Sequence, residues 1–366
     1  MVTYPANWKF DIIANIADIT TGCRDTQDNK VNGRFPFFVR SPIVERIDVA
    51  DFDCEAVLTA GDGVGTGKVF HYINGKFAAH QRVYVMSNFK DVDGRYFYYY
   101  FSNNFGKEVE KYTAKSSVDS VRRDMIAEME FPYPPLPEQK EIVKALLDFD
   151  EHIDNLTELI EKKKAVRDGA LEDLINGKTR LDGFRGDWNS CKINDVADFF
   201  DNLRIPVTKN QRMPGNTPYY GANGIQDYVS GYTHDGEFIL IAEDGANDLL
   251  NYPVTYASGK IWVNNHTHVL AGIKSVADTK FLSYLLKKVD YTAVLVGGTR
   301  AKLNGKTLKN IEITLPESIS EQQAIASILT VMDEEIESLL TEKAKMVQIS
   351  EGAMDDLLTG RVHLKV

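Results

Sequence analysis

The chain has 366 residues, 43% of them hydrophobic and 10% aromatic, which is enough for two or three domains with substantial cores. No stretch reaches the roughly 18 consecutive apolar residues of a membrane span, and the N-terminus lacks the basic and apolar regions of a secretory signal. Three widely separated cysteines (Cys23, Cys54 and Cys191) favour neither a disulfide framework nor a zinc site. We therefore expect a cytoplasmic protein without a bound metal.

The net charge of −11 argues at first against DNA binding, but the charge is unevenly distributed. Residues 138–181 and 321–366 have net charges of −3 and −5, whereas residues 1–137 and 182–320 have net charges of only −2 and −1. The two nearly neutral stretches can each present one basic face. Charge therefore permits DNA binding without predicting it.

The chain repeats itself at an offset of about 183 residues. Glu138-Gln-Lys-Glu-Ile142 recurs as Glu321-Gln-Gln-Ala-Ile325, and residues 174–181 recur as 357–364. Matches over nearly the whole chain predict two copies of one unit. Further matched pairs at similar offsets are Trp8 and Trp188, Asp62 and Asp244, Gly75 and Gly259, and Met129 and Ile311.

The first copy begins with a globular stretch, residues 1–137. Short β-type runs such as Ala56–Thr59 and Arg82–Met86 are separated by glycine-rich turns, including Gly61–Gly67. The aromatic run Tyr96–Phe101 could stack on unpaired bases, but packing in a core is the favoured interpretation. The stretch therefore predicts a domain of mixed secondary structure.

Residues 138–181 are predicted to form one long helix. Pro134, Pro135 and Pro137 end the first domain and leave Glu138 in the opening turn, where a carboxylate suits the helix dipole. Gly177 lies where a C-terminal cap belongs. Apolar residues with 4-3-4-3-4 spacing form the seam of a coiled coil. These residues are Ile142, Leu146, Phe149, Ile153, Leu156 and Ile160.

The second copy comprises a domain, residues 182–320, and a helix, residues 321–366. The domain has β-type runs at Phe238–Ala242 and Ile261–Val263, and Gly360 is the expected C-terminal cap of the helix. The seam residues of this helix are Ile325, Leu329, Met332, Ile336 and Leu339, continued by Met346, Ala353 and Leu357.

A helix of 39 residues is roughly 58 Å long and apolar along only one stripe. We expect the two helices to pack antiparallel as a coiled coil, with the domains held apart and pseudo-twofold symmetry within one chain. The alternative is two separate bundles, each helix folding on its own domain. The predicted fold class is α+β.

The duplicated arrangement of Pro-x-Glu-Gln, a coiled-coil helix and Leu-x-x-Gly behind a variable domain resembles the specificity subunit of type I restriction–modification systems. The motif residues are Pro137-Glu138-Gln139 and Leu174–Gly177 in the first copy, and Pro316, Glu321-Gln322 and Leu357–Gly360 in the second. Tyr219–Ile225 and Gly298–Leu303 also resemble segments of these recognition domains.

The resemblance implies two mixed α/β target-recognition domains, each reading half of a split DNA site, and two conserved spacer helices that act as a ruler. It also implies that the helices dock two modification subunits, which supply S-adenosylmethionine binding and adenine methylation, and that motor-nuclease restriction subunits can join. No cofactor is expected in this chain. The residues expected to pair the helices or contact the partner subunits are Glu138, Gln139, Ile142, Leu146, Ile153, Leu156, Glu321, Gln322, Ile325, Leu329, Ile336 and Leu339.

The DNA-contacting candidates are cationic and amide side chains near predicted turns, because Arg pairs with guanine, Asn pairs with adenine and cations bind phosphates. The loop Gly61–Gly67 resembles no nucleotide P-loop, since Lys68 is followed by Val69. The first-domain candidates are Lys68, His80, Arg82, Lys115, Arg122 and Arg123. The second-domain candidates are Asn223, Asn247, His266, His268, Thr299, Arg300 and Lys302.

Catalytic interpretations find little support. The chain lacks the Asp/Asn-Pro-Pro-Tyr/Phe tetrapeptide of amino-methyltransferases and a glycine-rich turn for S-adenosylmethionine. Glu243-Asp244 has no following Glu-x-Lys that would complete a nuclease site. His266 and His268, which should face one side of a strand, lack a third metal ligand. We expect a recognition subunit with no catalytic residues. The alternatives are a coiled-coil protein-binding scaffold, or a self-sufficient methyltransferase or nuclease with degenerate motifs.

Overall fold

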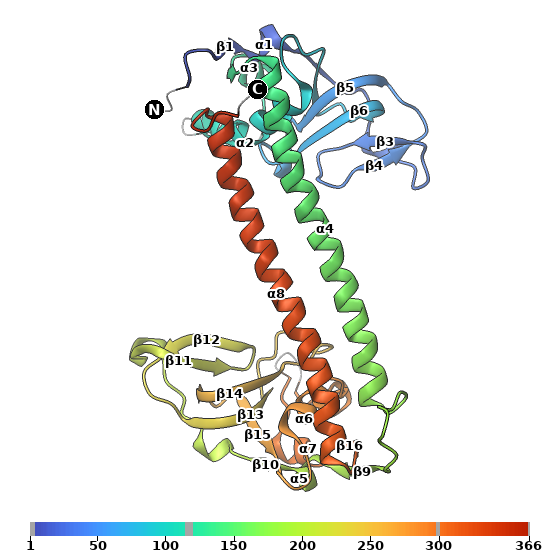
Figure 1. Ribbon diagram of the computed structural model, residues 1–366, viewed down its shortest axis with the longest axis vertical. Helices are drawn as coiled ribbons and strands as arrows, with labels where there is room; N and C mark the ends of the chain where they lie inside the picture. Colours follow the sequence, from blue (N-terminus) through green and yellow to red (C-terminus); the bar gives the residue numbers. More distant parts are fainter. Residues whose placement is uncertain (1–3, 114–119, 298–300, 365–366) are drawn as a thin grey trace. The chain divides into compact units, whose positions relative to one another are not determined.

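The computed structural model describes residues 4–113, 120–297 and 301–364, and the chain divides into two compact units (Figure 1). Unit 1 comprises Met1–Thr157 and Thr341–Val366, and unit 2 comprises Glu158–Leu340. Each unit holds one globular domain and part of each of two long helices. No helix among the described residues is long and apolar enough to cross a membrane.

The first domain is built on a six-stranded sheet with the order β2-β7-β5-β6-β3-β4. The pairs are antiparallel except β3 with β6, which runs parallel with Phe37 opposite Ala78. The predicted runs at 56–59 and 82–86 fall in two of the central strands. The strands are β2 (Asp18–Thr21), β3 (Phe35–Phe38), β4 (Glu45–Ile47), β5 (Phe52–Ala60), β6 (Phe70–Ala79) and β7 (Val83–Ser87).

The second domain repeats this sheet with the order β10-β15-β13-β14-β11-β12. Its one parallel pair, β11 with β14, stands at the same place, with Tyr219 opposite Trp262. The duplication expected from the sequence is therefore confirmed at the level of sheet topology. The strands are β10 (Ala197–Phe199), β11 (Pro214–Gly221), β12 (Gly224–Val229), β13 (His234–Ala242), β14 (Val254–Val263) and β15 (Thr267–Gly272).

One helix packs on each sheet. Helix α2 (Gly94–Thr113) contacts β5 and β6, and helix α6 (Thr279–Leu286) contacts β13 and β14. In α2 the buried Phe97 ring stacks on Phe131 with 5.0 Å between ring centroids. The aromatic run is thus confirmed as core.

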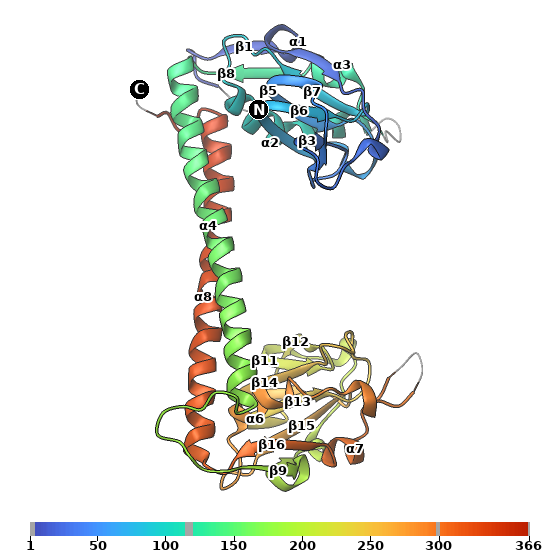
Figure 2. The same cartoon turned by 90° about the vertical axis from the view of Figure 1, so that its right-hand side faces the viewer.

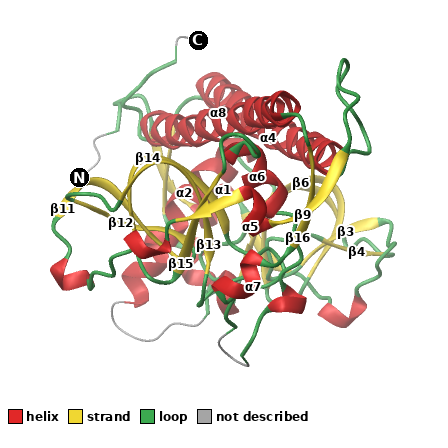
Figure 3. Cartoon of the chain, turned by 90° about the horizontal axis from the view of Figure 1, so that it is seen from below, coloured by secondary structure: helices red, strands yellow, loops and turns green. Residues whose placement is uncertain are grey.

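Two small antiparallel sheets and several short helices complete the domains (Figure 3). The first domain adds β1 (Lys9–Ile12) paired with β8 (Glu130–Tyr133), α1 (Ile13–Ile16), α3 (Arg123–Ala127), η1 (Thr26–Asp28) and η2 (Gly63–Gly65). The second adds β9 (Trp188–Lys192) paired with β16 (Glu312–Pro316), α5 (Ile193–Val196), α7 (Gly305–Lys309), η3 (Asp201–Leu203), η4 (Lys209–Gln211) and η5 (Thr292–Val294).

The long helices are α4 (Leu136–Ile175) and α8 (Ile319–Leu358), each 40 residues. Gly177 and Gly360 follow their ends with φ of 65° and 69°, the left-handed conformation that glycine adopts without strain. A Cβ at Gly177 would lie 3.3 Å from the Trp188 ring, and one at Gly360 would lie 2.5 Å from Pro5. Both predicted caps are therefore confirmed. The absence of a side chain at each glycine also lets Trp188 or Pro5 pack closely against it.

Within each unit, the segments of α4 and α8 lie side by side and antiparallel (Figures 1 and 2). In unit 1, His152 Nε2 lies 3.9 Å from a Glu342 carboxylate oxygen. In unit 2, Lys163 Nζ lies 2.7 Å from Glu335. These contacts contradict the alternative in which each helix packs only on its own domain.

The seam is less uniform than the heptad spacing predicts. Midway along the pair Leu156, Ile160 and Ile336 are buried, whereas Ile153 and Leu339 are only half-buried. Near the helix starts the seam residues enter the domain cores. Ile142 and Leu146 join the first-domain core, and Ile325 and Leu329 join the second. The predicted coiled coil is confirmed, and the seam residues at the start of each helix also belong to a domain core.

Gln139 and Gln322 fasten each long helix to its own domain. The Gln139 amide oxygen accepts from the Asp93 backbone N–H at 2.7 Å, and its nitrogen donates to the Asp91 and Pro134 carbonyls. Gln322 makes the same three contacts, with Asp278, Val276 and Pro316. Both side chains are fully buried.

The glutamates before these glutamines are also buried, and each faces a basic side chain that follows the other long helix. Arg180 donates to both carboxylate oxygens of Glu321 at 2.7 and 2.9 Å. His363 Nδ1 lies 3.0 Å from Glu138. The Glu-Gln motif therefore makes its contacts within its own unit. Its predicted contact with partner subunits stays a prediction.

Candidate nucleic-acid interface

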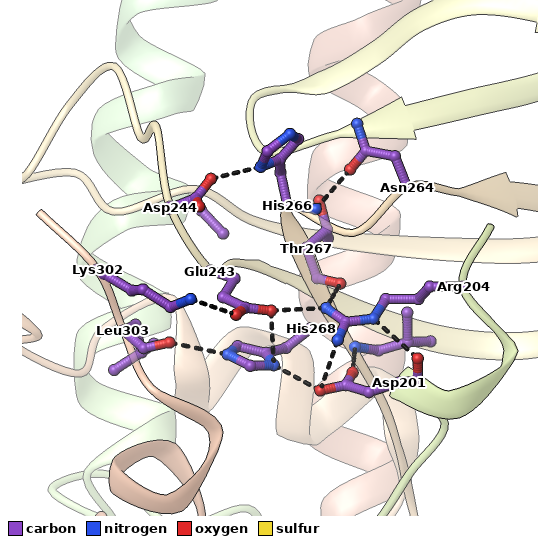
Figure 4. Close-up of polar contacts among 12 residues, drawn as sticks. Asp201, Arg204, Glu243, Asp244, Asn264, His266, Thr267, His268, Lys302 and Leu303 are labelled. Carbon is purple, nitrogen blue, oxygen red and sulfur yellow. Dashed lines mark hydrogen bonds and ion pairs between the residues drawn. The ribbon is translucent and has the colours of Figure 1, made fainter. Parts of the chain in front are cut away.

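A network of charged side chains joins three loops of the second domain (Figure 4). The buried His268 lies at its centre. Its Nδ1 faces Asp201 Oδ2 at 2.6 Å, and its Nε2 faces the Leu303 carbonyl at 2.9 Å. The two ring nitrogens therefore face a carboxylate oxygen on one side and a backbone carbonyl on the other.

Glu243 completes the network. It accepts from Arg204 Nη1 at 2.8 Å, and Lys302 Nζ lies 2.9 Å from its other carboxylate oxygen. Burial by itself would raise the pKa of Glu243, but the hydrogen bonds from Arg204 and Lys302 outweigh burial and the pKa is lowered. For Asp201 the effect of burial is outweighed in the same way, chiefly by the bond from His268, and its pKa is also lowered.

The network fixes the segment that begins at Lys302. The Leu303 backbone N–H donates to the Glu243 carbonyl at 2.8 Å, and Asp244 and Lys302 form an isolated antiparallel bridge. The cation of Lys302 is held at the domain edge beside the end of β13. The arrangement has positioning contacts but no group of three or more His, Cys, Asp or Glu able to hold a metal among the described residues.

The neighbouring edge carries more accessible polar groups. His266 Nδ1 lies 2.5 Å from Asp244, and the His266 side chain is 42% exposed. Asn223 bridges two loops, because its amide donates to the Gly245 carbonyl and accepts from the Asn247 N–H, both at 2.9 Å. The structure thus brings the predicted Asn223, Asn247, His266 and Lys302 to one edge of the domain.

The first domain has the same backbone hydrogen bonds at this place, and we call this shared set of bonds the backbone frame. The Gly61 N–H donates to the Arg82 carbonyl at 2.7 Å, as the Glu243 N–H donates to His266 at 2.8 Å. The Val121 N–H donates to the Gly61 carbonyl, as Leu303 does to Glu243. The matched positions are therefore Gly61 and Glu243, Arg82 and His266, and Val121 and Leu303.

The side chains on this shared frame differ. Tyr84 takes the place of His268, and its hydroxyl donates to the Val121 carbonyl at 3.2 Å, where His268 reaches Leu303. Glycine takes the place of Glu243, and Ser120 takes the place of Lys302 in the isolated bridge. The same fold thus presents different chemistry at its two edges.

The first-domain candidates are not all at this edge. Arg82, Arg122 and Arg123 are exposed and line one hollow. Lys68 is exposed at the turn after η2, on the connection from β5 to β6. His80 is only 4% exposed, and its Nδ1 accepts from the Arg82 backbone N–H at 3.0 Å.

Two of the predicted DNA-contacting histidines, His80 and His268, are buried. Burial also lowers the pKa of His80, which favours the neutral ring. His268 is equally enclosed. The expectation that His266 and His268 alternate along one strand is wrong, because β15 begins at Thr267, after His266. The His266 side chain is partly exposed, whereas His268 is buried. Lys115, Thr299 and Arg300 lie outside the described residues.

Several residues of this edge could not be identified from the sequence. Asp201, Arg204 and Tyr84 carry no motif, and Glu243 draws attention only as half of a carboxylate pair. A broad hollow of about 1010 Å³ with Lys192, Lys306 and Lys309 on its lining was also not foreseen. Matching the two copies position by position would have found Glu243, which stands opposite a glycine.

Comparison with known proteins gives a consistent result. The family model described as "Type I restriction modification DNA specificity domain" matches residues 5–164 and again 185–346. A type I restriction enzyme specificity subunit of Haemophilus influenzae is 46% identical over 149 residues, which are 41% of this chain and 38% of that protein. The chain thus matches well under half the length of this relative.

Two further relatives match over more of the chain. The MjaVIII specificity subunit of Methanocaldococcus jannaschii is 26% identical over 84% of this chain and 79% of its own length. The crystal structure of a type I S subunit from M. genitalium covers 98% of this chain and 97% of its own with a TM-score of 0.73, at 17% identity. The latter likeness supports the fold. Two family matches covering most of the chain, on two domains of one topology, show that this chain belongs to the type I restriction–modification DNA specificity family.

Proposed function

We propose that the chain is the non-catalytic, sequence-reading subunit of a type I methylation complex, and that it recognises a bipartite DNA target with one half-site for each domain. The observation that carries the proposal is the duplicated frame with different side chains. Gly61 matches Glu243 and Tyr84 matches His268 on identical backbone pairing. A common scaffold with unlike surfaces supports two different half-sites and an asymmetric target.

The side chains at the two edges have the chemistry that this role needs. Arg is the usual partner of guanine and Asn of adenine, and each good bidentate contact contributes roughly 1–3 kcal/mol of discrimination. Exposed arginines lie at the edge of the first domain, and Asn223, Asn247 and His266 lie at the edge of the second. We therefore expect the two half-sites to differ in base sequence.

The long helices have two roles in the proposal. A 40-residue helix is about 60 Å long, so the pair sets the number of unspecified base pairs between the half-sites. It also docks two modification subunits, which bind S-adenosylmethionine and methylate adenine, and motor-nuclease subunits can join this complex.

Co-expression of the chain with its modification subunit in a host free of adenine methylation tests the proposal, with single-molecule sequencing to map modified adenines. We expect one bipartite motif with a methylated adenine on each strand. Soluble, associated subunits without new methylation would contradict the proposal and favour a protein-binding scaffold.

A further inference from the structure

The two domains share a backbone frame but differ in what fills it. In the second domain Glu243 occupies the frame and binds the cations of Arg204 and Lys302. In the first domain the matched residue is Gly61, and a Cβ there would lie 2.8 Å from the Arg82 carbonyl oxygen and 3.2 Å from the Tyr84 ring. The first domain therefore has no side chain, and no anion, at this place.

A hollow of about 410 Å³ adjoins this place in the first domain, lined among others by Gly61, Arg82, Ser120, Arg122 and Arg123. We call these five residues the arginine pocket. Thr21 and Tyr84 also line it, so hydroxyl groups accompany the cations. None of the described residues that line the pocket is a carboxylate.

Few carboxylates lie close to the arginine side chains of the pocket. Among residues 4–113, 120–297 and 301–364, the side chains of Arg122 and Arg123, which line the pocket, have no hydrogen-bond or ion-pair partner. Arg82 Nε lies 3.8 Å from Asp62, which already accepts from Arg40 at 2.8 Å. The Asp124 carboxylate also acts on Tyr84. The pocket thus gathers three arginines beside these two carboxylates, in a protein whose net charge is −11.

The shape of the site favours a phosphate over a base edge. Base edges are recessed in the DNA grooves, about 8.5 Å deep in the major groove, and only projecting side chains reach them. A backbone phosphate protrudes from the duplex and is compact, so it fits a concave site lined by arginine and hydroxyl donors. Glu243 gives the precedent, since the same frame in the second domain already surrounds an oxyanion with cations.

We propose that the arginine pocket binds a DNA backbone phosphate beside the first half-site, and that Glu243 blocks the equivalent site in the second domain. The inference rests on the proposed DNA-reading function. The two half-sites are then held unequally: the first domain contributes phosphate contacts at this frame, and the second contributes none.

The test uses the complex of this chain with its modification subunits, bound to a duplex that carries the mapped target, over a range of salt concentrations. Each phosphate contact adds about 0.9 to the steepness of log affinity against log salt. Arg122→Gln with Arg123→Gln should make this slope shallower by about 1–2. Affinity should fall by about tenfold or more, equally for target and non-target duplexes, as expected for lost charge-assisted bonds.

Lys90→Gln is the control, because Lys90 is exposed and is not among the predicted DNA contacts. Its slope should equal that of the parent complex. Lys302→Gln tests the second domain, where Glu243 already pairs with Lys302, and should change the slope less than the double arginine variant does. An unchanged slope in the double arginine variant, or a loss confined to duplexes with one particular first half-site, would overturn the phosphate assignment while leaving the proposed function intact. An equal change in the Lys302 variant would overturn the claim that Glu243 blocks its site. A parent complex that does not prefer its target would overturn both the inference and the proposed function. Thermal unfolding of each variant verifies the fold.

Discussion

Arg180 holds the carboxylate of Glu321 with two hydrogen bonds across 141 residues of sequence, and no part of the Glu321 side chain is appreciably exposed. The Arg180 residue follows α4, and Glu321 opens α8. The pair therefore joins the end of one long helix to the start of the other within unit 2. His363 and Glu138 make the corresponding contact in unit 1 with one hydrogen bond.

Arg180→Ala should destabilise unit 2 by about 2–4 kcal/mol, because it leaves the buried Glu321 carboxylate unpaired. His363→Ala should cost under about 1 kcal/mol, since the His363 side chain is half exposed and water can replace it. Urea unfolding of both variants measures the difference. Equal losses would show that the two matched contacts are energetically equivalent despite their different burial.

Gly360→Ala should destabilise unit 1 by at least about 1–2 kcal/mol, because alanine is strained at a φ of 69° and its Cβ would collide with Pro5. Gly352→Ala is the control. Gly352 lies within α8 with no atom within 4 Å of a Cβ, so alanine there should stabilise the helix by up to about 1 kcal/mol. Thermal unfolding distinguishes the two signs, and a stabilised Gly360 variant would refute the cap assignment.

Acid should weaken the second-domain network. The folded-state pKa values of Asp201 and Glu243 lie below their ordinary values. Their stabilisation is therefore complete above the unfolded pKa values, about 3.9 and 4.3, and is lost as pH falls through the lower folded values. Urea unfolding of unit 2 between pH 6 and pH 3 should show this loss. Asp201→Asn should make the pH dependence shallower, and an unchanged dependence would exclude Asp201 as a contributor.

Lengthening both helices should lengthen the spacer of the target. Seven residues inserted at matched positions of α4 and α8 preserve the heptad seam and add about 10 Å, or roughly three base pairs. Methylation mapping should return the same two half-sites with a longer gap. Unchanged spacing with full activity would show that the helices are not the ruler.

Features that depend on local pattern or on internal repetition can be predicted from the sequence alone. The 183-residue offset revealed the duplication, and the seam from Ile142 to Ile160 predicted a long helix because helical periodicity is local. Glycine at 177 and 360 predicted the caps for the same reason. Proline and Glu-Gln placed each helix start within a few residues.

Contacts between side chains that are far apart in the sequence depend on the tertiary fold. Gln139 bonds to Asp93, and His268 to Asp201, through contacts 46 and 67 residues apart that no local pattern encodes. Burial of His80 and His268 follows from how strands pair and loops close over them, so an alternating strand pattern could not foresee it. The contrast between the open arginine pocket and the occupied Glu243 site likewise depends on three separate segments meeting at one sheet edge, because the free energy of that meeting comes from long-range pairing and packing.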